Sequence, residues 1–206
     1  MDALSIAAQI LVGISLAACC GLRAFLPPFV LGLAVRLNVG QLLPGIPIEL
    51  NPAFNWLGSN TALIVFGTAV VLELLADKVP VIDHALDVVQ TVVRPLAGGL
   101  VVAASFQDAP VPVAAAAGLI AGAPIAGAVH VGKAKIRILS TLGTGGLASP
   151  VLSVIEDALA LLGSILSVVF ALFAILLIVF GIFVTRKALR GFHRRAVRLQ
   201  ENLENR

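Results

Sequence analysis

Long apolar runs alternate with short polar segments along this chain. A bilayer core about 30 Å thick needs roughly 20 apolar residues of helix. A further segment, residues 81–106, is also apolar, but Asp83, Asp87 and Arg94 interrupt it, so it needs protein neighbours. The runs that are free of Asp, Glu, Lys and Arg, and therefore predicted to cross a membrane, are 3–22, 50–72, 109–132 and 158–185.

Composition supports a membrane protein. The 206 residues are 59% hydrophobic and only 12% charged, against about a quarter charged in a typical soluble domain. The runs are continuous, whereas the strands of a β-barrel give short alternating segments. Every backbone group in lipid must also be satisfied internally. The sequence therefore predicts an all-α, polytopic transmembrane helical bundle in which Gly and Pro break some helices.

Positive charge predicts the orientation and the number of crossings. Seven of the 14 Lys and Arg residues follow the last apolar run, in the tail 186–206. This positive-inside pattern predicts a cytoplasmic C-terminal tail after a transmembrane domain of residues 1–185. The segment "GKAKIR", 132–137, is interpreted as a second basic loop. If both are cytoplasmic, residues 138–185 supply two crossings, the first of them 138–158, and the total is five or six.

The same features limit the partners. The net charge of +3 comes from the basic tail, which favours contact with anionic lipid headgroups over nucleic acid. Gly and Ala residues in 97–128 allow close helix contacts within one chain or in a homo-oligomer.

Cys19 ends "SLAAC", which resembles a lipoprotein cleavage box. The N-terminus lacks a basic n-region, however, so residues 3–22 are expected to remain as the first helix.

A weak internal repeat has two explanations. Many transporters are internal duplications with a binding site between the halves. Chance similarity between apolar segments explains the repeat equally well. Three pairs recur at an offset of about seventy residues: Arg23 with Arg94, Pro80 with Pro150, and Asp87 with Asp157.

Ionisable residues between the second and third apolar segments suggest a polar site. A charge at the bilayer centre costs several kcal/mol, so it must face a partner, water or the interface. Residues 77–87 are typical of a solvated turn at the membrane surface. Glu73, Asp87 and Arg94 lie deeper, and we expect them to form an intramembrane ion pair or a cation site. Asp87 with Arg94, two helical turns apart, is the simplest pair.

Arg23 is a further candidate. It precedes "AFLPPF", whose adjacent prolines remove backbone donors and break a helix. A broken helix beside an arginine can receive an anion. A snorkelling arginine at a membrane boundary explains the pattern equally well.

The segment "STLGTGGLASP", 140–150, is the last candidate. Its hydroxyl groups and flexible backbone can coordinate an ion, as unwound transporter helices do, or can form a close helix contact or loop. It lacks the lysine of a phosphate-binding P-loop. The candidate residues are Thr141, Thr144, Gly145 and Gly146, followed by the acidic pair Glu156 and Asp157.

Enzyme signatures are weak. His84, His130 and His193 are scattered, and no nucleophile motif is present. The acidic pair in "DHALD", 83–87, is compatible with Mg²⁺ and a lipid pyrophosphate, but helices often carry such pairs. We therefore expect no enzymatic activity, no catalytic residue and no cofactor. Whether the carboxylates bind a metal is not decided by their spacing.

Three stretches resemble a known family. They are "CGLRAFLPPFVLGLA", "WLGSNTALIVFGTAVVLELLADKVPVIDHALD" and "STLGTGGLASPV". In order and spacing they are similar to an uncharacterised family of bacterial integral membrane proteins, domain of unknown function 4126. The resemblance covers nearly the whole chain except the basic tail. It implies a multi-pass protein of the bacterial inner membrane, and it carries no activity or substrate.

The leading functional hypothesis is a small membrane transporter or channel for an ion or small solute. The alternative is a non-transporting scaffold or lipid-binding protein in which the same charges are structural pairs. In the first case the polar path comprises Glu73, Asp87, Arg94, Glu156 and Asp157, completed by Arg23 and the segment 141–146.

Overall fold

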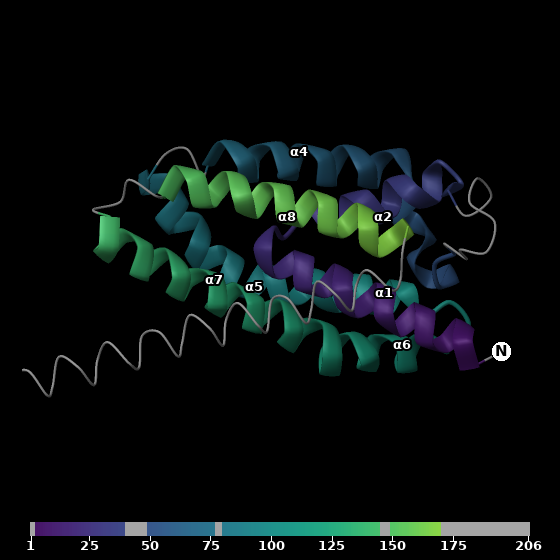
Figure 1. The fold of residues 1–206 in the computed structure, drawn as a ribbon. Coiled ribbons are helices and arrows are strands. Elements are labelled where there is room, and N and C mark those ends of the chain that lie inside the picture. Colours follow the sequence, from purple (N-terminus) through teal and green to yellow (C-terminus); the bar gives the residue numbers. More distant parts are fainter. Residues whose placement is uncertain (1–2, 40–48, 77–79, 145–148, 170–206) are drawn as a thin grey trace, which may run out of the picture.

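The protein is an α-helical bundle in the part of the chain that the structure describes (Figure 1). This structure is a computed structural model, and it describes residues 3–39, 49–76, 80–144 and 149–169. The helices are α1 (Ala3–Leu22), α2 (Leu26–Arg36), the 3₁₀ helix η1 (Pro52–Gly58), α4 (Asn60–Ala76), α5 (Pro80–Ser105), α6 (Val111–Ala117), the π-helical turn η2 (Gly118–Gly122), α7 (Ala123–Thr144) and α8 (Ser149–Val169).

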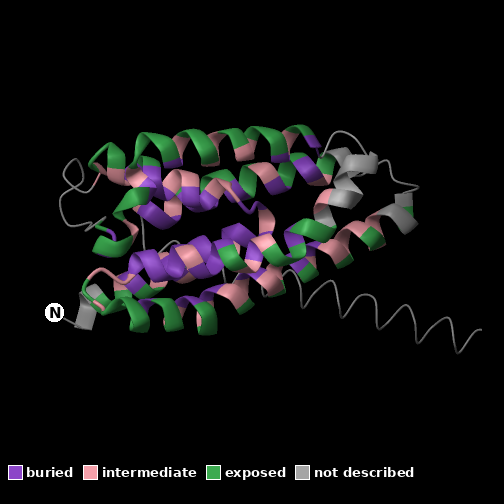
Figure 2. Ribbon diagram, turned by 180° about the vertical axis from the view of Figure 1, so that it is seen from behind, coloured by how far each residue is buried: buried purple, intermediate pink, exposed green. Residues whose placement is uncertain are grey.

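Helix α1 lies at the centre of the bundle. It packs lengthwise against α5 and also contacts α7 and α8. Buried residues accordingly concentrate on the inner helices, whereas α4 exposes most of its surface (Figure 2). The apolar core contains Leu16, Ala17, Cys20, Val101 and Val102.

Helices α1 and α2 form a hairpin that enters the bundle and returns to the end from which it came. At that end, the side-chain amide of Gln9 lies 3.5 Å from the Gln107 side chain. Gly58 lies beside the end of α2, where its Cβ position is 3.8 Å from the Arg36 nitrogen. Asn51 bonds the connection that follows α5, through the carbonyls of Phe106 and Ala109, both at 2.8 Å. The turn of the hairpin therefore lies inside the bundle (Figure 1).

Glycines allow α5 and the α6–α7 segment to approach backbone to backbone. A Cβ added at Gly118 would lie 2.3 Å from the Gly99 carbonyl oxygen, and one added at Gly122 would lie 2.3 Å from the Gly98 carbonyl oxygen. Glycines four residues apart are the usual means of close helix contact in membranes. The π-helical turn η2 coincides with this contact.

Among the residues that the structure describes, three helices are long and apolar enough to cross a membrane, and a bent pair raises the count to four. The three are Val88–Ser105, Val111–Ser140 and Val151–Val169, and the bent pair is η1 with α4, at 62°. This confirms the predicted helical bundle, but the predicted five or six crossings are not confirmed. Residues 170–185, which the sequence assigns to a last crossing, lie outside the described residues, as does the basic tail.

Two local predictions are wrong. Residues 132–137 are not a loop but the middle of α7, because Lys133 and Arg137 both pair with Glu156 inside the bundle. Residues 138–158 are not a broken crossing: residues 138–144 end α7, and 149–158 begin α8. The Gly- and Pro-containing stretch therefore connects two helices.

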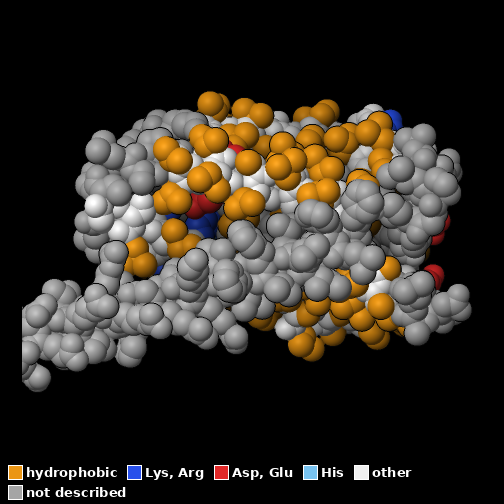
Figure 3. All heavy atoms as spheres, in the orientation of Figure 1, with side chains coloured by type: hydrophobic (Ala, Val, Ile, Leu, Met, Phe, Trp, Pro, Cys, Tyr) orange, Lys and Arg blue, Asp and Glu red, His pale blue; other side chains and the backbone are white. Residues whose placement is uncertain are grey.

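The outer surface is hydrophobic. Figure 3 shows one face covered largely by apolar side chains, with acidic and basic atoms visible in openings beside α8. A surface of this kind is compatible with a membrane protein, because apolar side chains in lipid need no burial. Exposed large side chains on α4, α5 and α8 include Ile64, Leu72, Leu75, Val88, Val92, Leu96, Val154, Leu162 and Ile165.

Candidate functional site

The break between α1 and α2 is the centre of a buried polar network. Helix α1 ends at Leu22, and α2 begins at Leu26. Pro27 and Pro28 occupy the first turn of α2, where a missing N–H costs little, but they prevent α1 from continuing through them. The break leaves carbonyl groups at the end of α1 and N–H groups at the start of α2 inside the bundle.

Two cations bind the carbonyls at the end of α1. Arg94 Nη1, on α5, donates to the Gly21 oxygen at 3.0 Å. Lys133 Nζ, on α7, donates to the Leu22 oxygen at 3.2 Å. Positive charge is favourable at a helix C-terminus, which carries a partial negative charge.

One carboxylate binds the backbone just before α2. The Glu73 oxygens on α4 accept from the N–H groups of Ala24, at 3.1 Å, and Phe25, at 3.4 Å. No side chain of the break itself provides this cap. Gln90 Nε2 donates to Glu73 Oε1 at 2.9 Å, and Arg94 Nη2 lies 3.9 Å from the same oxygen. Glu73 is only 2% exposed, so these donors replace water around a buried negative charge.

Arg94 also joins two further polar side chains. It donates to Gln90 Oε1, and its Nη1 lies 2.7 Å from Nδ1 of His130. Since an arginine can only donate, Nδ1 accepts, and a neutral His130 carries its proton on Nε2. That nitrogen faces Thr91 Oγ1 at 3.4 Å. The network therefore fixes the tautomer of His130.

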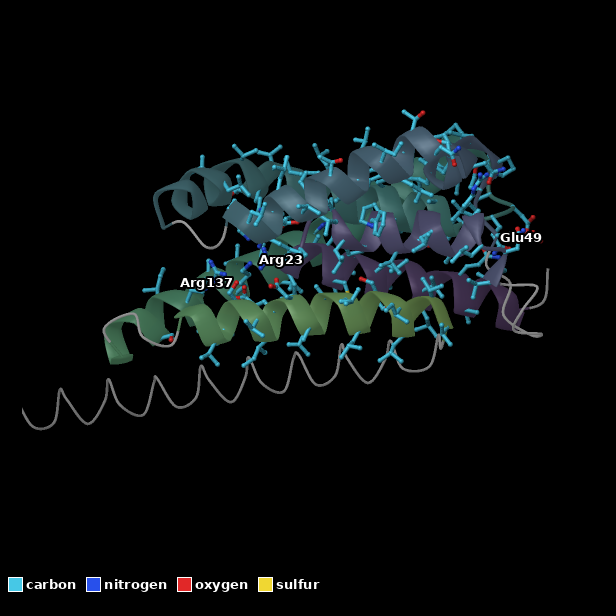
Figure 4. All side chains as sticks on the ribbon, turned by 90° about the horizontal axis from the view of Figure 1, so that it is seen from above. Arg23, Glu49 and Arg137 are labelled. Atoms are coloured by element: carbon cyan, nitrogen blue, oxygen red, sulfur yellow. The ribbon has the colours of Figure 1, made fainter. Side chains whose placement is uncertain are left out.

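Helix α8 contributes two adjacent acids. Glu156 Oε2 pairs with Lys133 Nζ at 3.0 Å and with Arg137 Nη2 at 2.9 Å. Asp157 pairs with Arg23, which also donates to Ser153 Oγ at 3.4 Å. Figure 4 shows Arg23 and Arg137 inside the bundle on the side of α8, whereas Glu49 lies at the far end of the molecule.

A cavity of about 90 Å³ lies beside this network. Its polar lining comes from Arg23, Glu73 and Asp157. Its apolar lining comes from Leu26 on α2, Leu161 on α8, and Val70 and Leu74 on α4. The cavity thus lies between α4 and α8, next to the first residue of α2.

The network lies well inside the apolar span. Arg94 is six residues after Val88 and eleven before Ser105, the two ends of the apolar window on α5. At about 1.5 Å per residue, this places it roughly 9 Å from one end and 16 Å from the other. Arg23 and Arg94 are 1% and 0% exposed, respectively.

The structure brings together half of the candidate residues that the sequence identified. Five of the ten belong to the network, in which Arg94 pairs with Glu73. They are Glu73, Arg94, Arg23, Glu156 and Asp157. The predicted pair with Asp87 is not described, because the structure gives no placement for that side chain. Thr141 and Thr144 belong to the last turn of α7, again without described side chains, and Gly145 and Gly146 lie outside the described residues.

Sequence reasoning missed three ionisable members of the network. His130, Lys133 and Arg137 were assigned to an apolar run and a surface loop. Their spacing of three and four residues is helical, and it places all three on one face of a segment that is otherwise rich in Ala, Val and Gly. This periodicity is the signal that identifies them.

Comparison with known families agrees with the resemblance noted above. The family model described as domain of unknown function (DUF4126) matches residues 10–190. The chain belongs to this family. The match includes every member of the network around Arg23 and Arg94. The comparisons with curated proteins and with solved structures gave no match.

Proposed function

We propose that this DUF4126 protein is a small membrane transporter or channel for an ion or small solute. The observation that supports the proposal most directly is the broken α1–α2 helix, whose two ends meet charged side chains beside a cavity in the interior. Discontinuous helices of this kind form the substrate and ion sites of many transporters. The proposal is not enzymatic.

The network provides an exchangeable polar path. Among the described residues it contains three carboxylates and four cationic side chains, contributed by four helices and the α1–α2 break. A solute or proton that joins one carboxylate changes the balance among neighbouring cations, because each acid has at least one cation within 4 Å. Glu156, shared by Lys133 and Arg137, is the acid whose partners are most easily redistributed.

The membrane setting is part of the proposal. We place the protein in the inner membrane of a bacterium, with the basic tail 186–206 in the cytoplasm beside anionic lipid headgroups. The alternative function, a non-transporting scaffold or lipid-binding protein, is favoured by the saturation of Glu73 with four hydrogen-bond or ion-pair donors. Such saturation also suits a charge with a purely structural role.

Flux measurements distinguish the two functions. Purified protein is reconstituted in liposomes, and flux of protons, Na⁺, K⁺ and Cl⁻ and of a panel of small solutes is measured. We expect flux above that of empty liposomes, reduced at least severalfold by Glu156→Gln and unchanged by Glu49→Gln, which alters an exposed acid far from the network. If no tested ion or solute crosses with folded wild-type protein, transport is rejected in favour of the scaffold.

A further inference from the structure

The cavity between α4 and α8 has a polar and an apolar part. The polar lining includes the buried side chains of Arg23 and Glu73, whereas the apolar lining lies nearer the outer surface of the bundle. In the lining, Leu161 is 43% exposed; on the facing helix Leu72 and Leu75, which are next to the lining residues Glu73 and Leu74, are 61% and 60% exposed. In a bilayer these side chains contact hydrocarbon, so the cavity is entered from the lipid side. Acidic and basic atoms are visible beside α8 within this hydrophobic face (Figure 3).

The charges of the lining favour a cation at the entrance. Of the ionisable residues that line the cavity, two are carboxylates and one is an arginine. The Asp157 side chain is 25% exposed, whereas the side chain of its partner Arg23 is 1% exposed. A molecule that enters therefore meets the carboxylate first. The other cations of the network also face acids: Arg94 lies 3.9 Å from Glu73, and Lys133 and Arg137 are engaged by Glu156.

The dimensions set the size of the polar group. A volume of about 90 Å³ holds several water molecules or a small headgroup, but not a whole lipid. An alkyl chain attached to that headgroup would remain between the apolar side chains of α4 and α8.

We propose that the cavity binds the ammonium group of an alkylammonium amphiphile that enters from the bilayer, with Asp157 as its main ligand. This inference rests on the proposed transport function only for the step in which the bound ligand would be carried across the membrane, because binding itself requires no flux. Glu73 supplies negative charge at the inner wall, while its bonds to Ala24 and Phe25 keep it in place. Both a free alkylamine and the amine headgroup of a lipid carry the required chemistry.

Binding is tested with three probes that share one chain. Decylammonium, decanoate and decanol are titrated by calorimetry into the full-length protein in neutral maltoside micelles. We expect decylammonium to bind at least tenfold more tightly than the other two, since one charge-assisted contact contributes about that factor. Tighter binding of decanoate would assign the cavity to an anion, and equal binding would show no preference for an ammonium group; either result would overturn the proposal.

Two pairs of variants locate the site. Asp157→Asn should weaken decylammonium binding about tenfold while its amide oxygen still accepts from Arg23, whereas Asp108→Asn, at an exposed position, should not. Leu161→Trp fills the cavity and should abolish binding, whereas Leu162→Trp, next to it on α8 but outside the lining, should leave binding intact. Unchanged binding in both Asp157→Asn and folded Leu161→Trp would contradict the proposal.

The source of the ammonium group and the transport function are tested separately. Phosphatidylethanolamine added to the micelles should compete with decylammonium if the ligand is a lipid, and should not compete if it is a free amine. Either result supports an ammonium site once the variants have located it. Site-specific binding without flux in liposomes would reject transport and keep the site. Flux without site-specific binding would reject the site and keep transport.

Discussion

Arg94 shows how a single residue makes a buried charge tolerable. Its guanidinium group is fully buried, yet it reaches the Gly21 carbonyl, Gln90, His130 and the Glu73 carboxylate. An unpaired ion in low dielectric costs several kcal/mol, so each of these contacts replaces hydration that burial removed. Removing one partner therefore leaves an uncompensated charge.

Glu73→Gln should lower the free energy of unfolding by about 3 kcal/mol, the low end for breaking a buried ion pair. The amide keeps the shape of the side chain but removes the negative charge that faces Arg94 and the N–H groups of Ala24 and Phe25. Denaturation in mixed micelles measures the change. Glu49→Gln, at an exposed position, serves as the control and should change stability by less than about 0.5 kcal/mol. Equal effects of the two substitutions would show that Glu73 is not a structural cap.

At the scale of elements, the α1–α2 break and the α5–η2 contact are two ways of bringing backbone into the interior. The break exposes backbone polar groups, which side chains of α4, α5 and α7 then satisfy. The α5–η2 contact instead brings two helical backbones so close that only glycine fits. It holds α7, with Lys133 and His130, at the distance from α5 at which the network forms.

Gly122→Ala should destabilise the protein by about 1–3 kcal/mol, the usual cost of overpacking. Its methyl group would lie 2.3 Å from the Gly98 oxygen, so one helix must move. Gly132→Ala, where nothing lies within 4 Å of the added carbon, should cause no loss of stability, because alanine is the better helix former. Thermal unfolding of both variants in the same detergent tests this. Similar melting temperatures for the two would contradict the close contact.

At the scale of the whole molecule, the hairpin fixes which segments share an end. The end of α2, the η1 segment and the α5–α6 connection lie together, because Asn51 bonds Phe106 and Ala109 and Gly58 lies beside Arg36. The end of α7 lies at the opposite end of the bundle (Figure 1). If α1 and α2 return to one end, Arg36 lies on the same side of the membrane as the α5–α6 connection. If the segment that contains α1 and α2 crosses the membrane instead, Arg36 lies on the opposite side.

Single cysteines at Arg36 and Asp108, in a Cys19→Ala, Cys20→Ala background, should react with a membrane-impermeant maleimide from the same side. A cysteine at Gly143 should react from the other side. Labelling of intact cells and of inverted vesicles measures the two accessibilities. Opposite sidedness of Arg36→Cys and Asp108→Cys would show that α1 and α2 do not return to one end.

Some features were predictable because they depend on local sequence. The bounds of α1 and α5 follow almost directly from the uncharged run 3–22 and the segment 81–106. Pro80 and Pro150 both stand in the first turn of a helix, a position that favours proline. Glu73 and Arg94 were identifiable because ionisable residues in apolar segments are costly and need partners.

Other features depended on which helices meet. Lys133 and Arg137 look like loop residues when read as a basic run, and only the approach of α8 with Glu156 makes them interior. The contact of Arg94 with Glu73 likewise depended on the tertiary structure, because helical spacing points to a neighbour on α5, whereas Glu73 comes from α4.

The sequence by itself determined that this chain is helical and apolar, where α1 and α5 begin and end, and that acids and arginines lie in apolar surroundings. These properties follow from hydropathy, from proline and glycine, and from the cost of desolvating charge, all of which act along the chain. Only the tertiary structure decided that α1 and α2 turn back at Arg23 and which charges pair there. Those choices depend on contacts between helices that are distant in sequence, and no local pattern encodes them.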